Sequence, residues 1–225
     1  TYLSYLGTPA MTAEEIAQRM YQLACSFGLS AGSSVTNISL RGLDENLPEA
    51  VKIVEDLAYN AVPDENILAN LKADMLKSRS DSKLNQSSCF SALQRYIFYG
   101  PEFIRKITLT NDELMSLTSD ELLSKVRNLL DCQHEVIYYG PSSEQEVVKL
   151  ISEGHKVAPD LKPLEKKYAE YVPTPESKVF LVQYDAKQIY MISYSNTGEK
   201  YDPEKAPIIN MYGNYFGGGM NSIVF

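Results

Sequence analysis

The stretch TAEEIAQRMYQLACSFGLSAGSSVTNISLR, residues 12–41, contains both hydrophobic periods on which the fold depends. Its first half begins with a capping box, in which Glu15 follows Thr12 by three positions. Apolar residues then recur at helical spacing, and they are Ile16, Met20, Leu23 and Phe27. We expect Gly28 to end this helix, because glycine commonly stops a helical run. Apolar and polar residues alternate from 33 to 40, which predicts a half-buried strand.

The same signals predict the remaining elements. Further helices are expected to begin near Asn46, Asp64, Cys89, Asn111, Ser119, Ser143 and Asp202, with the Cys89 helix closed by 99–101. Short strands are expected at 135–139, 179–182 and 188–194, and residues 155–178, rich in Pro, Lys and Glu, form the expected linker. This order predicts an α+β fold with antiparallel sheets and helices on one face. We divide it into a helix-rich subdomain, 1–132, and the start of a second α+β subdomain, 133–225.

Composition excludes several classes of function. The 225 residues carry 29 acidic and 21 basic side chains, a net charge of −8, which argues against a nucleic-acid partner. No apolar run reaches the roughly 18 residues that a membrane span needs. Three cysteines without a C-x-x-C pair do not make a disulfide framework or a zinc ribbon, and the two histidines, His134 and His155, are not spaced as metal ligands. The residues alone therefore show no active site.

Several phrases occur in an order that resembles the pitrilysin/insulinase family of inverted-motif zinc peptidases, which includes the mitochondrial processing peptidases. The phrases are Tyr5-Leu6-Gly7-Thr8 before the acidic helix start at 12–15, Leu47-Pro48-Glu49-Ala50, Tyr138-Tyr139-Gly140, and the glycine-rich turn Phe216-Gly217-Gly218-Gly219-Met220-Asn221-Ser222. The resemblance covers nearly the whole chain. It implies two-layer α/β roll subdomains of the processing-peptidase type.

The family's zinc ligands are missing at the matching positions. Four residues separate Tyr2 from Gly7, so Tyr2 stands where the family has the second zinc histidine of H-x-x-E-H, and Thr1 stands at its catalytic Glu. The third ligand falls near Ser78, and Leu71 stands where a supporting Glu is often found. Tyrosine and serine without neighbouring histidines do not hold Zn²⁺, and no general base is left. The resemblance therefore implies an inactive segment without a metal of its own, with zinc in a homologous catalytic half.

The resemblance also implies a role for such a segment. It would be a fragment of a larger peptide-hydrolysing zinc metallopeptidase, contributing the closing wall of the substrate chamber. The expected wall residues are Tyr215, Phe216, Gly217, Gly218, Gly219 and Asn221. Its partners would be the catalytic half, on the same chain or on a homologous subunit, and a peptide substrate, in the periplasm or cell envelope. The alternative is a non-catalytic core subunit of the same fold that acts in protein–protein assembly.

The same residues also have ordinary structural interpretations that involve no catalytic or binding role. We expect His134 and His155 to be ordinary surface or core-edge histidines, and Cys25 and Cys89 to be small buried hydrophobes. Glycines 217–219 are also compatible with a simple helix break, and an unrelated thiol or phosphate enzyme would need Cys89 beside a histidine or an anion at this turn. The predicted strands at 179–194 would expose edges, so we expect self-association through them.

Overall fold

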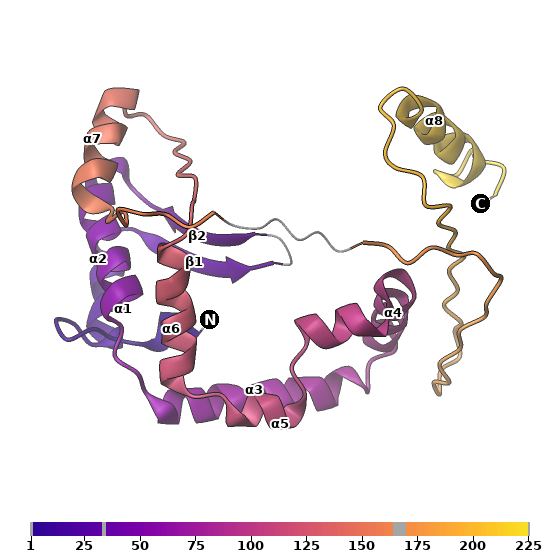
Figure 1. Cartoon of the computed structure of the whole chain (residues 1–225), viewed down its shortest axis with the longest axis horizontal. Helices are drawn as coiled ribbons and strands as arrows, with labels where there is room; N and C mark the ends of the chain where they lie inside the picture. The colour runs from indigo at the N-terminus through magenta and orange to yellow at the C-terminus, as the bar shows by residue number, and fades with distance from the viewer. Residues whose placement is uncertain (1, 33–34, 164–169, 225) are drawn as a thin grey trace.

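The computed structural model describes residues 2–32, 35–163 and 170–224 (Figure 1). Its helices are α1 (Ala13–Gln22), α2 (Leu47–Asn60), α3 (Glu65–Ser82), α4 (Gln86–Ile107), α5 (Asn111–Ser116), α6 (Ser119–Leu130), α7 (Glu144–Gly154) and α8 (Ala206–Gly217), with short 3-10 helices η1 (Tyr2–Tyr5) and η2 (Asp44–Asn46). Strands β1 (Ser26–Ala31) and β2 (Thr36–Arg41) form an antiparallel pair, with Phe27 opposite Leu40. The chain is thus α+β, as the sequence predicts.

The start of α1 follows its sequence signal, and its end does not. Thr12 Oγ1 accepts a hydrogen bond from the Glu15 N–H at 3.2 Å, and the Glu15 carboxylate accepts one from the Thr12 N–H at 2.8 Å. The helix ends at Gln22, so the prediction that it continues to Gly28 is wrong. Ala24 adopts a left-handed φ of 48°, which turns the chain into β1. Phe27 therefore packs against the core from a strand.

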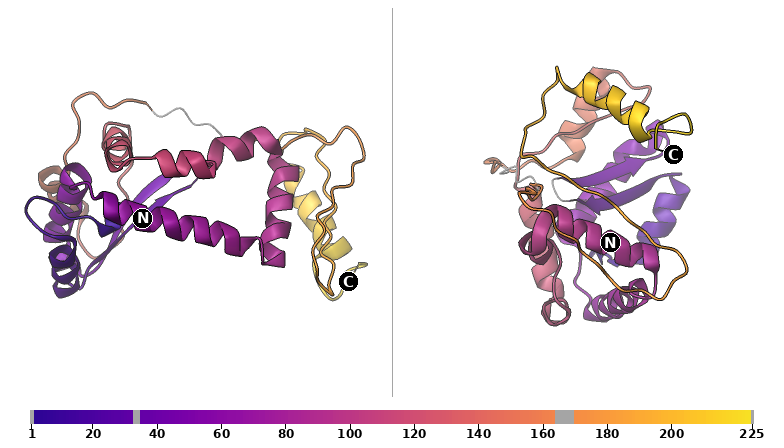
Figure 2. Two further views of the ribbon diagram at one scale, coloured as in Figure 1. Left: turned by 90° about the horizontal axis from the view of Figure 1, so that it is seen from below. Right: turned by 90° about the vertical axis from the view of Figure 1, so that its right-hand side faces the viewer.

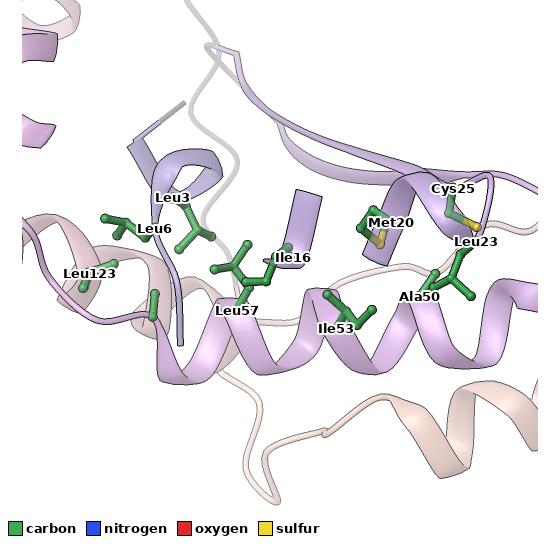
Figure 3. Packing of buried hydrophobic residues seen from close by; sticks show 11 residues of the cluster. Leu3, Leu6, Ile16, Met20, Leu23, Cys25, Ala50, Ile53, Leu57 and Leu123 are labelled. Carbon is green, nitrogen blue, oxygen red and sulfur yellow. The ribbon is translucent and has the colours of Figure 1, made fainter. Parts of the chain in front are cut away.

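The hydrophobic core lies between α1 and α2, with η1 at one end. Figure 3 shows Ala50, Ile53 and Leu57 of α2 lying along one side of this cluster. Its other labelled members are Leu3, Leu6, Ile16, Met20, Leu23, Cys25 and Leu123. Leu57 is only 1% exposed and Ala50 is fully buried. Nearly all of the cluster comes from the first 61 residues, and Leu123 of α6 is the contribution from farther along the chain.

A long helical arm carries the chain away from this core. Helix α3 begins at Asp64, whose carboxylate accepts hydrogen bonds from the N–H groups of Asn66 and Ile67. Helix α4 follows it and is interrupted at Gly100, so the predicted break at 99–101 is confirmed, and a second helical stretch then continues to Ile107. Gly100, with a φ of 75°, kinks α4 immediately before Pro101. Figure 2 shows the arm between the sheet and the C-terminal part of the chain.

The strands predicted at 135–139, 179–182 and 188–194 do not form in the part of the chain that the structure describes. These segments are extended, but a strand also needs a hydrogen-bonded neighbour, and residues 179–194 lie instead against α4. The Tyr184 hydroxyl donates to the Leu84 carbonyl at 2.5 Å, and Gln86 Nε2 donates to the Gln188 carbonyl at 2.7 Å. Without strands, the predicted strand-edge route to self-association loses its basis.

The predicted boundary between 1–132 and 133–225 remains a prediction. Within the expected linker 155–178, residues 164–169 lie outside the described residues. An isolated bridge joins Cys132 to Lys162, so the chain on both sides of the boundary is in contact. The last helix, α8, begins at Ala206, four residues after the predicted start. In the described part of the chain, none of the helices has the combination of length and hydrophobicity that a bilayer span requires.

Candidate functional site

Tyr2, at the expected position of a zinc histidine, lies at a junction of three elements. Its hydroxyl accepts a hydrogen bond from the Asp64 N–H at 2.9 Å and lies 2.7 Å from Ser119 Oγ. Asp64 precedes α3, and the fully buried Ser119 opens α6. A second bond closes the junction, from the Ser119 N–H to a carboxylate oxygen of Glu65 at 2.8 Å. The side chain of Tyr2 thus holds the starts of two helices beside η1.

The other matched position lies far from Tyr2. Ser78 is exposed and stands fourteen residues along α3 from Asp64. At about 1.5 Å per residue, that separation is about 21 Å. Leu71 lies between them on α3, half-buried, while Thr1 lies outside the described residues. Tyr2 and Ser78 therefore do not converge on one point. Among the described residues no three or more His, Cys, Asp and Glu side chains are grouped as a metal site.

The expected wall residues lie at the end of α8 and in the turn after it. Tyr215, Phe216 and Gly217 belong to the helix, and Gly218, Gly219 and Asn221 follow it. All six are exposed. The chain then folds back, because the Ile223 N–H donates to the Tyr215 carbonyl at 3.1 Å and the Val224 N–H donates to the Phe216 carbonyl at 2.8 Å. A side chain at Gly218 would meet Asn214 Cα at 2.6 Å, so this turn needs a glycine there.

Helix α8 presents apolar side chains to solvent on several sides. Its exposed members are Ile208, Ile209, Met211, Tyr212, Tyr215 and Phe216. The Tyr212 and Phe216 rings stack with centroids 5.5 Å apart and planes inclined by 12°. An exposed apolar surface of this kind is unusual on a monomeric protein.

A second apolar surface lies on residues 179–192, from which Phe180 and Tyr190 face α4. The Phe180 ring contacts Tyr96, and the Tyr190 ring contacts Phe90 at 5.5 Å between centroids. Phe180, Val182, Tyr190 and Ile192 are 41–49% exposed, whereas the four apolar side chains at odd-numbered positions point outward and are 82–93% exposed. They are Val179, Leu181, Ile189 and Met191. This alternation is typical of a segment with two apolar faces, of which α4 covers one.

Asp44 of η2 holds the segment after residue 137 against the start of α2. Its two carboxylate oxygens accept hydrogen bonds of 2.5 Å from the Ser142 and Tyr138 hydroxyls. These bonds, that of Ser142 first, hold the pKa of the Asp44 carboxyl below its usual value. A pocket of about 300 Å³ between η2, α2 and α7 includes all three residues in its lining. Because Asp44 is already engaged by both oxygens, we assign it a structural role.

The structure brings together two residues that sequence reasoning kept apart. His134 and His155 lie 21 positions apart in sequence, yet their Nε2 atoms are 2.8 Å apart. His155 Nδ1 lies 2.5 Å from a carboxylate oxygen of Glu55, on α2. Burial and the negative charges of Glu55 and Asp131 raise the pKa of the neighbouring Tyr59 hydroxyl. No sequence signal marks this cluster, because α7 and the chain after α6 must fold onto α2 to create it.

Comparison with known proteins identifies the architecture. No protein-family model and no curated protein matches the sequence. Among solved structures, the chain is similar to the ferredoxin protease FusC in complex with Arabidopsis ferredoxin (TM-score 0.61, 11% identity). It is also similar to the periplasmic protease PqqL from Escherichia coli (TM-score 0.59, 14% identity). The chain shares the fold of these proteases.

The similarity covers 76% of this chain in both cases, but only 19% of each protease. The chain thus spans about a fifth of the length of the proteases it matches. At identities of 11% and 14%, the likeness concerns the fold and does not carry over individual residues. The peptidase-like fold agrees with the expectation drawn from the sequence.

Proposed function

We propose that this chain is a non-catalytic segment of a larger zinc peptidase of the pitrilysin type, and that it forms part of the wall around the bound peptide. The observation that carries the proposal is the fold shared with two proteases, together with the exposed apolar surface of α8. The zinc that acts in peptide hydrolysis would be held by a homologous catalytic half.

The contacts of Tyr2 support the non-catalytic part of the proposal. A residue that joins Asp64 and Ser119 is occupied in holding two helices, and Ser78 lies about 21 Å along α3. A catalytic zinc needs three protein ligands around one ion and a base beside it. These two side chains provide neither ligands nor a base.

The exposed apolar surface of α8 supports the proposal that this chain lines the peptide-binding chamber. Extended peptides bind through apolar side chains and through backbone groups, and aromatic residues contribute most of the affinity at such surfaces. Tyr215 and Phe216 combine large apolar area with exposure, and the adjoining glycine turn allows close approach of another backbone. The catalytic half would face this surface across the bound peptide.

Two measurements on the purified chain test the proposal. The chain with added Zn²⁺ should not hydrolyse fluorogenic peptides, and hydrolysis that a chelator abolishes would overturn the non-catalytic assignment. The chain should bind a fluorescein-labelled unstructured peptide in an anisotropy titration, and Tyr215→Ala should weaken that binding several-fold. The matched control is Tyr21→Ala, which removes an exposed tyrosine of α1. Equal peptide affinities of the two variants would refute the proposal that α8 forms part of the wall around the bound peptide.

A core subunit acting only in assembly is the second candidate, and the same apolar surface favours it. Such a subunit would not bind the labelled peptide, and its α8 would be covered permanently by a partner protein. The anisotropy titration therefore separates the two functions as well.

A further inference from the structure

The histidine pair joins three parts of the chain. His155 caps the C-terminal end of α7, His134 follows α6, and Glu55 lies on α2. The two imidazole rings meet nearly edge to face, with centroids 4.9 Å apart and planes inclined by 83°. Their Nε2 atoms point toward each other at 2.8 Å. The His155 side chain is 16% exposed and that of Glu55 14%, while His134 lies open to solvent.

The partners of the other two ring nitrogens fix where the protons are. His134 Nδ1 lies 2.7 Å from the Cys132 carbonyl oxygen, which only accepts, so this nitrogen carries a proton. His155 Nδ1 lies 2.5 Å from Glu55 Oε1. The second oxygen, Oε2, accepts a bond from the Lys156 N–H at 3.3 Å. An ionised carboxylate only accepts, so Oε1 is the acceptor toward His155 Nδ1. His155 Nδ1 therefore carries a proton too.

A neutral imidazole with a proton on Nδ1 has a lone pair on Nε2. Both Nε2 atoms consequently face the same short gap of 2.8 Å, which holds a single cation, either a proton shared in an N–H···N hydrogen bond or a metal ion that replaces it. In this pair the Nε2 atoms converge, while one Nδ1 atom is bonded to a carboxylate and the other to a backbone carbonyl. Histidine ligands of protein-bound transition metals have the same arrangement. The carboxylate and the carbonyl hold the rings in the tautomer that binds a metal.

We propose that His134 and His155 bind one divalent transition metal ion of the zinc or nickel class through their Nε2 atoms, with Glu55 as a positioning residue. Zn–N bonds of about 2.0–2.1 Å in tetrahedral geometry separate the two nitrogens by about 3.3 Å, so the rings need to open by only about 0.5 Å. Water completes the coordination on the solvent side, next to His134. Imidazole donors favour zinc, nickel and copper over magnesium and calcium.

The bound ion would connect α7 and the segment after α6 to α2. Those parts already meet through several hydrogen bonds, among them the bond from the Tyr59 hydroxyl to the Lys156 carbonyl at 2.9 Å and the bond from the Lys156 N–H to Glu55 at 3.3 Å. This site is separate from the peptide surface on α8, and it stands or falls independently of the proposed function.

Titration of the whole chain with Zn²⁺ and with Ni²⁺, followed by calorimetry under reducing conditions, tests the site. We expect one equivalent of metal to bind, at least tenfold more weakly in His134→Gln and in His155→Gln. Cys89→Ser is the control, because it removes a possible ligand on α4, and it should bind as the wild type does. Absence of binding at millimolar metal, or equal affinity in the wild type and both histidine variants, would overturn the proposal.

A second readout does not depend on the variants folding. The chain has only two histidines, so proton NMR shows two imidazole Cε1–H signals. Paramagnetic Ni²⁺ should broaden both at the same metal-to-protein ratio. Broadening of one signal alone, or of neither, would overturn the shared site. Glu55→Gln should keep the stoichiometry and weaken affinity about tenfold, as expected for loss of a partner that orients a ligand.

Discussion

Replacing Tyr2 by phenylalanine tests whether the Tyr2 hydroxyl, at the expected position of a zinc ligand, stabilises the fold. The substitution removes one oxygen atom and keeps the ring. The Asp64 N–H then loses the acceptor at 2.9 Å, and Ser119 Oγ loses the partner at 2.7 Å. Both groups lie at helix starts, so the change acts on α3 and α6 together.

The magnitude follows from the burial of the two partners. A buried polar group left without its hydrogen bond costs about 1–3 kcal/mol. Ser119 is fully buried, whereas Asp64 is half-buried and regains part of the loss from water. We therefore expect the free energy of unfolding to fall by about 2 kcal/mol. With a denaturant slope of about 2 kcal/mol per molar urea, the midpoint moves by about 1 M.

Urea unfolding followed by circular dichroism measures this shift. Tyr21→Phe is the matched control, since it removes the same atom from a tyrosine that is 85% exposed. Exposed substitutions of this kind change stability by less than about 0.5 kcal/mol. Equal midpoints for Tyr2→Phe and Tyr21→Phe would refute the junction as a stabilising feature. An unchanged slope is needed for the comparison, because a changed slope signals a different unfolded state or an intermediate.

Three further predictions concern other parts of the fold. Leu57→Ala should lower the free energy of unfolding by about 3–5 kcal/mol in the same assay, because Leu57 is 1% exposed, and a loss below about 1 kcal/mol would contradict the core described. Gly100→Ala should cost about 1–3 kcal/mol, since its φ of 75° suits glycine, and an unchanged melting temperature would argue against the kink. The lowered pKa of Asp44 means that its stabilisation is present at neutral pH and is lost as pH falls below about 3.9. The protection of the amides of residues 138–142, measured as the intrinsic exchange rate at each pH divided by the observed rate, should therefore fall below that pH, and Asp44→Asn should remove this dependence.

Helix starts could be predicted from the sequence because their signals are local. The capping box at Thr12 forms as expected, and the helix start predicted at Ser143 is confirmed, with a further capping box between Ser143 and Glu146. The starts predicted at Asn111 and Ser119 are confirmed as well, with Thr110 and Thr118 as the capping residues. In each case a hydroxyl and a carboxylate three residues apart satisfy the first free N–H groups of the helix.

Strands could not be predicted as well, because a strand depends on a partner that the local sequence does not specify. Phe27 fits the helical period of residues 16–27, and only the left-handed turn at Ala24 moves it into β1. Residues 179–192 alternate as a strand would, but Phe180 and Tyr190 pack against the rings of α4. The pattern predicted strands, which do not form, and it gave no information about which element covers the segment.

The candidate sites also differ in whether local sequence is enough to locate them. The exposed glycine turn after α8 could be located from its composition alone. The histidine pair could not, because its three contributors are 21 and about 100 positions apart in sequence. Such a cluster becomes visible only when α2, α6 and α7 are in place.

The position of the core within the chain has a consequence for biosynthesis. Since a ribosome releases the N-terminus first, the residues of the cluster between α1 and α2 emerge before the rest of this chain, and Leu123 joins them before residues 124–225 are made. Helix α4 is also finished before residues 179–192 exist. Residues 179–192 can therefore pack against the aromatic rings of an α4 that is already formed. Their apolar side chains on the other face become exposed together when this packing occurs. Synthesis itself therefore sets the order in which the two apolar faces of that segment become available.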